Sequence, residues 1–147
     1  MSLTHPSKGA IACSPNGQIL MVKLPDKEAI AMLHSGSANT GFNLVTQVPI
    51  PNTGPVHYLF FLPPPVFSAD GLKFAIVAKD GTVSVWDVRN KRPFMVKEPD
   101  GIVDTVSCLQ FSGGTLGREV LAFVEVSQLC LGIIFFMLIK LLEQRCY

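Results

Sequence analysis

The sequence has few of the residue patterns that enzymes and metal-binding proteins share. Its three histidines, His5, His34 and His57, are scattered, and none lies at ligand or triad spacing from a suitable partner. No serine lies in a nucleophile elbow, and the glycine-rich segment at 113–118 lacks the Gly-Lys-Ser/Thr of a phosphate loop. We therefore predict that the chain is not an enzyme and that it binds no metal and no cofactor.

Charge and cysteine content also exclude several classes of protein. The formal net charge is +1, and no basic stripe of the kind that binds nucleic acid is present. The first ten residues are polar and lack the apolar run of a secretory signal. The four cysteines lack metal-ligand spacing and pairing rhythm, which predicts reduced thiols. We expect a cytoplasmic or nuclear protein that has no nucleic-acid partner.

The most informative segment is residues 67–87, FSADGLKFAIVAKDGTVSVWD. A turn at 68–71 is followed by a mostly apolar run at 72–78, which favours a strand. Asp80-Gly81 then predicts a tight hairpin turn with positive φ at both positions. From 82 to 87 the residues alternate, which places Val83 and Val85 on one face and Trp86 on the other. The segment therefore predicts three antiparallel strands joined by two turns.

With its final Trp-Asp pair, this segment resembles the central part of a WD repeat, the four-stranded blade of a β-propeller. The Gly-His pair of that family is missing, and one unit alone ends in Trp-Asp. The segment VSCLQFSGGTLGREVLAF, at 106–123, also resembles a poorly characterised fungal group of WD-repeat-like proteins. The resemblance implies a structural role in the blade for seven residues: Ser68, Asp70, Gly71, Asp80, Gly81, Trp86 and Asp87.

Two weaker copies of the pattern flank the strong one. The turn serines Ser14, Ser68 and Ser112 are 54 and 44 residues apart. The second spacing fits one WD repeat of about 40–45 residues, and the first fits one repeat with an insertion. Blade-like units are predicted near 8–35, 56–98 and 104–125, with a Pro- and Gly-rich insertion at 36–65 and a candidate strand at 58–62. Because propellers need at least about four blades, we predict an all-β, partial WD-type propeller of about two to three four-stranded antiparallel blades over residues 1–125.

The character of the chain changes after Glu125. Residues 129–139 contain no polar side chain, and the stretch 126–142 is just long enough to cross a bilayer. We predict an apolar C-terminal helix over much of 126–147. Three interpretations stay open: a membrane anchor, a helix buried against the propeller, or a translated intron that begins at Val126-Ser127, where an intron start would read Val-Ser in frame.

Since no catalytic constellation is found, we expect a scaffold that binds other proteins through loops and strand edges. The alternative is a tail-anchored membrane protein whose blades form a docking head in the cytoplasm. Further blades or a partner are expected to complete the fold, because each blade buries only part of a shared core. A basic turn formed by Arg89, Lys91 and Arg92 is the candidate partner-binding loop for an acidic peptide. The simpler interpretation of this turn is a solvated hairpin tip.

Overall fold

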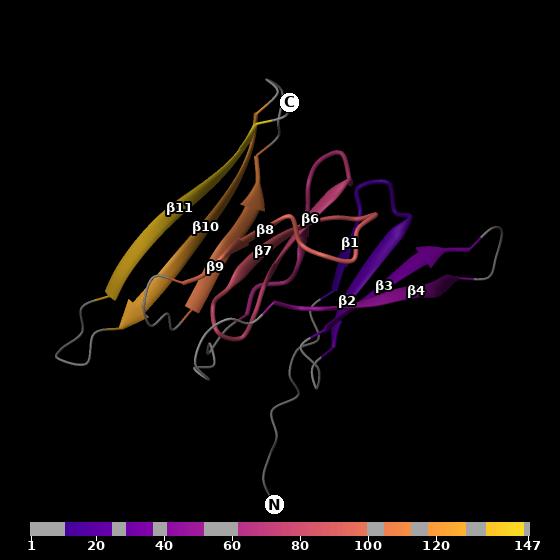
Figure 1. Cartoon of the computed structure of the whole chain (residues 1–147), viewed down its shortest axis with the longest axis horizontal. Helices are drawn as coiled ribbons and strands as arrows, with labels where there is room; N and C mark the ends of the chain where they lie inside the picture. The colour runs from indigo at the N-terminus through magenta and orange to yellow at the C-terminus, as the bar shows by residue number, and fades with distance from the viewer. Residues whose placement is uncertain are drawn as a thin grey trace, which may run out of the picture.

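The computed structural model describes residues 11–24, 29–36, 41–51, 62–99, 105–112, 118–128 and 135–145. Over these ranges the chain forms three antiparallel sheets, each of which follows the order of the chain (Figure 1). The first sheet contains β1 (Ile11–Cys13), β2 (Ile19–Leu24), β3 (Ala29–Ser35) and β4 (Phe42–Pro49). The middle sheet contains β5 (Val66–Phe67), β6 (Lys73–Val77), β7 (Val83–Asp87) and β8 (Met95–Lys97). The third sheet contains β9 (Thr105–Phe111), β10 (Arg118–Gln128) and β11 (Phe135–Arg145).

The same pair of serine hydrogen bonds links the first two strands of every sheet. Ser68 donates its backbone N–H to the carbonyl of Lys73 (2.9 Å), and its Oγ accepts from the Lys73 N–H (3.0 Å). Ser14 makes the equivalent pair with Ile19 (2.8 and 2.9 Å), and Ser112 makes it with Val120 (2.7 and 2.9 Å). The repeat that the sequence predicts at the three serines is therefore present in the structure.

Two of these turns share a further polar residue. Asp70 Oδ1 accepts hydrogen bonds from Ser68 Oγ (2.6 Å) and from the Leu72 N–H (2.9 Å). Asn16 Oδ1 accepts equivalent bonds from Ser14 Oγ (2.6 Å) and from the Gln18 N–H (3.1 Å). The glycine that follows has a φ of 71° at position 17 and 72° at position 71, a conformation that favours glycine. The hydrogen bond from Ser68 is the main reason that the pKa of Asp70 is lowered.

The turn between β6 and β7 differs from the prediction. Ala78 donates to the Thr82 carbonyl (2.8 Å) and Gly81 donates to the Ala78 carbonyl (3.0 Å), so the loop has three residues rather than two. The positive φ described in this loop is that of Gly81, at 93°. Asp80 holds the longer loop because its carboxylate accepts from both the N–H and the Oγ1 of Thr82, each at 2.9 Å.

The two central strands of the middle sheet, β6 and β7, are buried on both faces. Phe74, Ile76 and Trp86 pack against the first sheet. Val77, Val83 and Val85 pack against the third sheet. Burial on both faces explains why β6 is an uninterrupted apolar run after its first residue. The predicted division of β7, with Val83 and Val85 on one face and Trp86 on the other, is confirmed.

Trp86 is the largest fully buried side chain among the described residues. Its ring stacks on Phe74, with ring centroids 5.8 Å apart and planes 9° from parallel. Its Nε1 donates to Ser84 Oγ two residues earlier on the same strand (2.9 Å). Ser84 thus satisfies the indole N–H within β7, and the sequence pattern did not indicate this bond.

Two lysines join the sheets to one another. Lys23 is buried and donates from Nζ to the Val77 carbonyl of the middle sheet (2.6 Å). Lys73 forms an ion pair of 2.6 Å with Glu119 of the third sheet. Neighbouring sheets also contact one another through their first strands, β1 with β5 and β5 with β9. The sheets therefore share an inner edge formed by these strands and spread from it (Figure 1).

The segment predicted as an insertion at 36–65 contains β4, which pairs with β3 along its length. The first sheet accordingly has a fourth strand that the sequence interpretation omitted. A bulge between Met32 and Leu33 interrupts the register of this pair, and such irregularity obscures the alternation that identifies a strand. The candidate strand at 58–62 lies almost wholly outside the described residues, and β5 opens the middle sheet just after Pro63, Pro64 and Pro65.

The predicted C-terminal helix is wrong, because residues Phe135–Arg145 form strand β11. This strand pairs with β10 from Arg118↔Arg145 to Gln128↔Phe135. An apolar run cannot be assigned to helix or strand by periodicity alone, and β10 offers an edge whose backbone groups the run can satisfy. Strand β10 also continues past Glu125, where the predicted blade ended. Within the described ranges, no helix is long and apolar enough to cross a membrane.

Truncation of Trp86 should destabilise the chain strongly. We expect Trp86→Ala to lower the free energy of unfolding by about 3–5 kcal/mol, because a buried aromatic leaves a large cavity. Phe94→Ala, at an exposed aromatic, should cost less than about 1 kcal/mol. Urea unfolding followed by circular dichroism measures both, and similar losses for the two variants would contradict the central role of Trp86.

Candidate functional site

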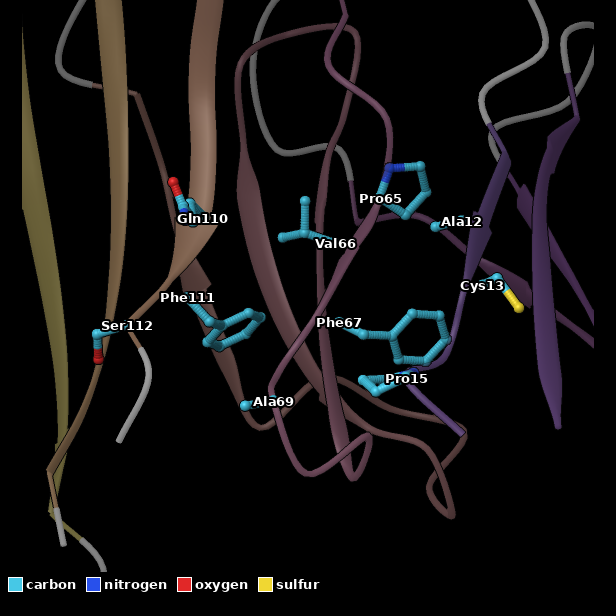
Figure 2. Close-up of a pocket in the computed structure, with 10 residues that line it drawn as sticks. All are labelled: Ala12, Cys13, Pro15, Pro65, Val66, Phe67, Ala69, Gln110, Phe111 and Ser112. Atoms are coloured by element: carbon cyan, nitrogen blue, oxygen red, sulfur yellow. The ribbon is translucent and has the colours of Figure 1, made fainter. Parts of the chain in front are cut away.

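A cavity of about 410 Å³ lies where the first strands of the three sheets meet (Figure 2). Its walls come from equivalent positions of the three repeats. Cys13, Phe67 and Phe111 each directly precede a turn serine. The residues before these three, Ala12, Val66 and Gln110, also line the cavity. Pro15 and Ala69, which follow Ser14 and Ser68, line it as well. The repeat of the sequence therefore becomes a repeat of the cavity wall.

The wall of this cavity is mostly apolar. Its polar side chains are the amide of Gln110, the hydroxyl of Ser112 and the free thiol of Cys13. In Figure 2 the ring of Phe111 points toward β5, and the sulfur of Cys13 points away from Val66. Across the part of the chain that the structure describes, no group of three or more His, Cys, Asp or Glu side chains could hold a metal ion. The cavity is suited to apolar groups and to a few hydrogen bonds.

The seven residues of the predicted blade motif do not form one site. Ser68, Asp70 and Gly71 lie together in the turn between β5 and β6. Asp80 and Gly81 form the turn at the opposite end of β6. Trp86 lies in the core, and Asp87 ends β7. These residues hold the middle sheet together and are not gathered around a ligand-sized space.

The basic turn after Asp87 is exposed and internally bonded. Arg89 donates from Nε to Asp87 Oδ1 (2.9 Å) and from Nη2 to Asp87 Oδ2 (2.6 Å), and its backbone N–H also bonds Oδ1 (2.8 Å). Lys91 and Arg92 are exposed. Of the three predicted loop cations, Arg89 is therefore held by its own turn, and the other two face solvent.

The bidentate pair determines the acidity of Asp87. Hydrogen bonding by Arg89 is the largest cause that lowers the pKa of Asp87 from 3.8 to about 2. The hydrogen bond with Asp87 in turn raises the pKa of Arg89. A paired carboxylate holds its charge to lower pH, since the charged form accepts the hydrogen bonds. The turn thus keeps its closed form over the pH range in which Asp87 is ionised.

A third candidate surface is the outer face of the first sheet, defined by Ile11, Cys13, Leu20, Val22, Leu33 and Leu44. Cross-strand pairing places these side chains on one face, opposite the residues that pack on the middle sheet. The sequence interpretation did not identify this face, although β2 reads ILMVKL and does not alternate with polar residues. A strand that is apolar at successive positions indicates that both faces of its sheet are covered.

No family model matches this sequence, and no curated protein matches it. Solved structures do match its fold. A provisionally named 6-phosphogluconolactonase from Bacteroides uniformis aligns with 86% of this chain and 38% of its own length, at a TM-score of 0.56 and 10% identity. A protein from Lactobacillus plantarum aligns with 90% of this chain and 44% of its own length, at a TM-score of 0.54 and 15% identity. The chain thus spans less than half of either protein.

Identities this low establish the fold alone. The chain has an all-β, propeller-like fold of antiparallel sheets, four-stranded in the first two. The expectation that the chain is not an enzyme is corrected by this comparison, because a protein with the same fold bears the name of a lactonase. Neither the fold nor the scattered histidines is a basis for excluding catalysis.

The Asp87–Arg89 pair should make stability depend on acid pH. The pKa of Asp87 is lower in the folded state than in the unfolded state, so its contribution is complete above about pH 4 and is lost as the pH falls toward about 2. Unfolding free energies measured between pH 5 and pH 2 should fall less steeply in Asp87→Asn and in Arg89→Gln. The effect should be modest, because the Arg89 side chain is exposed and solvent screens the pair.

Lys91→Gln is the control, because Lys91 lies in the same turn. Its pH profile should follow that of the wild type. The assignment would be wrong if Lys91→Gln flattened the profile as much as Arg89→Gln does.

Proposed function

We propose that this chain is a protein-interaction scaffold built from WD-type blades, and that its basic turn binds an extended acidic segment of a partner protein. The WD-type assignment is supported by the Trp86-Asp87 pair, by the repeated serine turns and by the propeller-like fold. The binding role is supported by the exposed apolar side chains of Phe94 and Val96, which follow the basic turn in the chain.

The observation that carries the proposal is an exposed apolar and basic surface at the outer edge of the middle sheet. Phe94 and Val96 are 43% and 42% exposed, whereas the strands behind them are buried on both faces. Val96 lies on β8, which is the last strand in the order of its sheet. An edge strand can accept an extended peptide through main-chain hydrogen bonds, and neighbouring side chains then select the sequence.

Charge selects an acidic partner. Arg89 is hydrogen-bonded to Asp87. The other two cations of the turn, Lys91 and Arg92, face solvent. A peptide whose alternate residues are acidic would place its carboxylates toward these cations while its other side chains contact Phe94 and Val96. Attraction between exposed charges is screened by salt, so binding should weaken as ionic strength rises.

A labelled ten-residue peptide of alternating Glu and Val tests the proposal, with alternating Gln and Val as its uncharged match. In fluorescence anisotropy we expect the wild-type chain to bind the Glu peptide more tightly. The double variant Lys91→Glu/Arg92→Glu should weaken binding about tenfold or more, since two attractive pairs become repulsive.

Lys79→Glu supplies the control, because Lys79 lies in the turn at the opposite end of β7. This variant makes the same type of charge reversal and should retain affinity. Equal affinity for the Glu and Gln peptides, or equal weakening by Lys79→Glu, would rule out the basic turn as an acidic-peptide site.

A further inference from the structure

The two faces of the first sheet are unequally covered although both are apolar. The face toward the middle sheet includes Ile19, Met21 and Ile30, and none of its core side chains is more than 7% exposed. On the opposite, outer face, Ile11 is 59% exposed and Leu44 is 57% exposed. An apolar sheet face normally packs against another layer, as both faces of the middle sheet do here.

The outer face extends across all four strands of the sheet. Leu20 pairs with Cys13 on β1 and with Leu33 on β3, and Leu33 pairs with Leu44 on β4. Val22 continues the same face, paired with Ile11. None of these six residues is charged. The result is a continuous apolar surface with the breadth of a whole sheet.

The third sheet, at the other end of the chain, also has apolar residues on its outward face, and these are less exposed than those of the first sheet. Leu121 and Phe123 of β10 pack against the middle sheet, so the residues that alternate with them point outward. Of these outward residues, Val120 and Ala122 are partly exposed, and Val124 is buried. The first and the third sheet thus both have apolar side chains on the face that points away from the middle sheet.

We infer that two copies of this chain associate head to tail, with the outer face of the first sheet of each copy packed on the third sheet of the other. Two copies supply six sheets, which lies within the range of about four to eight blades that close a propeller. A contact between different surfaces of identical chains closes into a ring when the rotation fits. The propeller-like neighbours are more than twice as long as the matched part of this chain, which agrees with a ring built from two halves.

This inference is independent of the basic turn. Binding of the acidic peptide and formation of the ring use different surfaces, so either one can fail without the other. Ring closure has a direct chemical consequence at Cys13. This exposed thiol lies on the outer face of the first sheet and becomes covered when a second copy packs there.

Analytical ultracentrifugation of the 147-residue chain is the first test. We expect a mass of about 32 kDa, twice the 16.0 kDa of one chain. Leu20→Glu on the outer face should give the single-chain mass, since it places a charge in the junction. Leu72→Glu is the matched control, because Leu72 is 47% exposed in the turn between β5 and β6 and should leave the two-copy mass unchanged.

Maleimide labelling of Cys13, resolved by peptide mass spectrometry, provides a second measurement that does not depend on a variant. Labelling should slow as the concentration of the wild-type chain rises. A single-chain mass at every concentration, with labelling of constant rate, would overturn the inference. Masses of three or more copies, irregular aggregates, or an equal effect of Leu72→Glu would also overturn it, because each is incompatible with a closed pair formed through this face.

Discussion

The burial of the middle sheet between two neighbours is the constraint on which the rest of this structure depends. Strands β6 and β7 have apolar side chains on both faces, and they are stable only if a sheet covers each side. Trp86, stacked on Phe74 and bonded to Ser84, anchors one of these junctions, and Val83 and Val85 occupy the other. Lys23 and Lys73 then join the neighbouring sheets to the middle one by a hydrogen bond to Val77 and an ion pair with Glu119. The first and third sheets each have one covered face for the same reason that the middle sheet has two.

The serine turn gives the three sheets a common construction. In each, one hydroxyl accepts the backbone N–H across the turn, and the backbone of the same serine bonds the partner residue. This places the first strand of every sheet in the same relation to the second, and the first strands contact one another at the inner edge. The cavity at this edge is consequently lined by equivalent positions such as Phe67 and Phe111. A feature of local hydrogen bonding therefore determines where this cavity lies.

The parts of this fold that short-range patterns determine could be predicted from the sequence, and the parts that pairing determines could not. The serine repeat and the alternation around Trp86 involve residues close in the chain, and both occur as predicted. Strand β11 was predicted as a helix, because its apolar residues carry no period and its conformation depends on the edge of β10. Asp80-Gly81 indicated a two-residue turn, but the bonds from Thr82 to Asp80 favour three. At the candidate sites, Lys91 and Arg92 were identified by charge, whereas the outer face around Leu20 becomes evident only when β1 to β4 are aligned.

The meander within each sheet also governs how the molecule opens. Every strand pairs with its neighbour in the chain, so each sheet is a local unit, and units coupled only to adjacent units lose structure from the ends inward. Opening of the middle sheet costs the most free energy, because it breaks the junctions with both neighbouring sheets. Its backbone amides in β6 and β7 are then the last to exchange with solvent deuterium, while those of the flanking sheets exchange through partial openings that leave Trp86 in place.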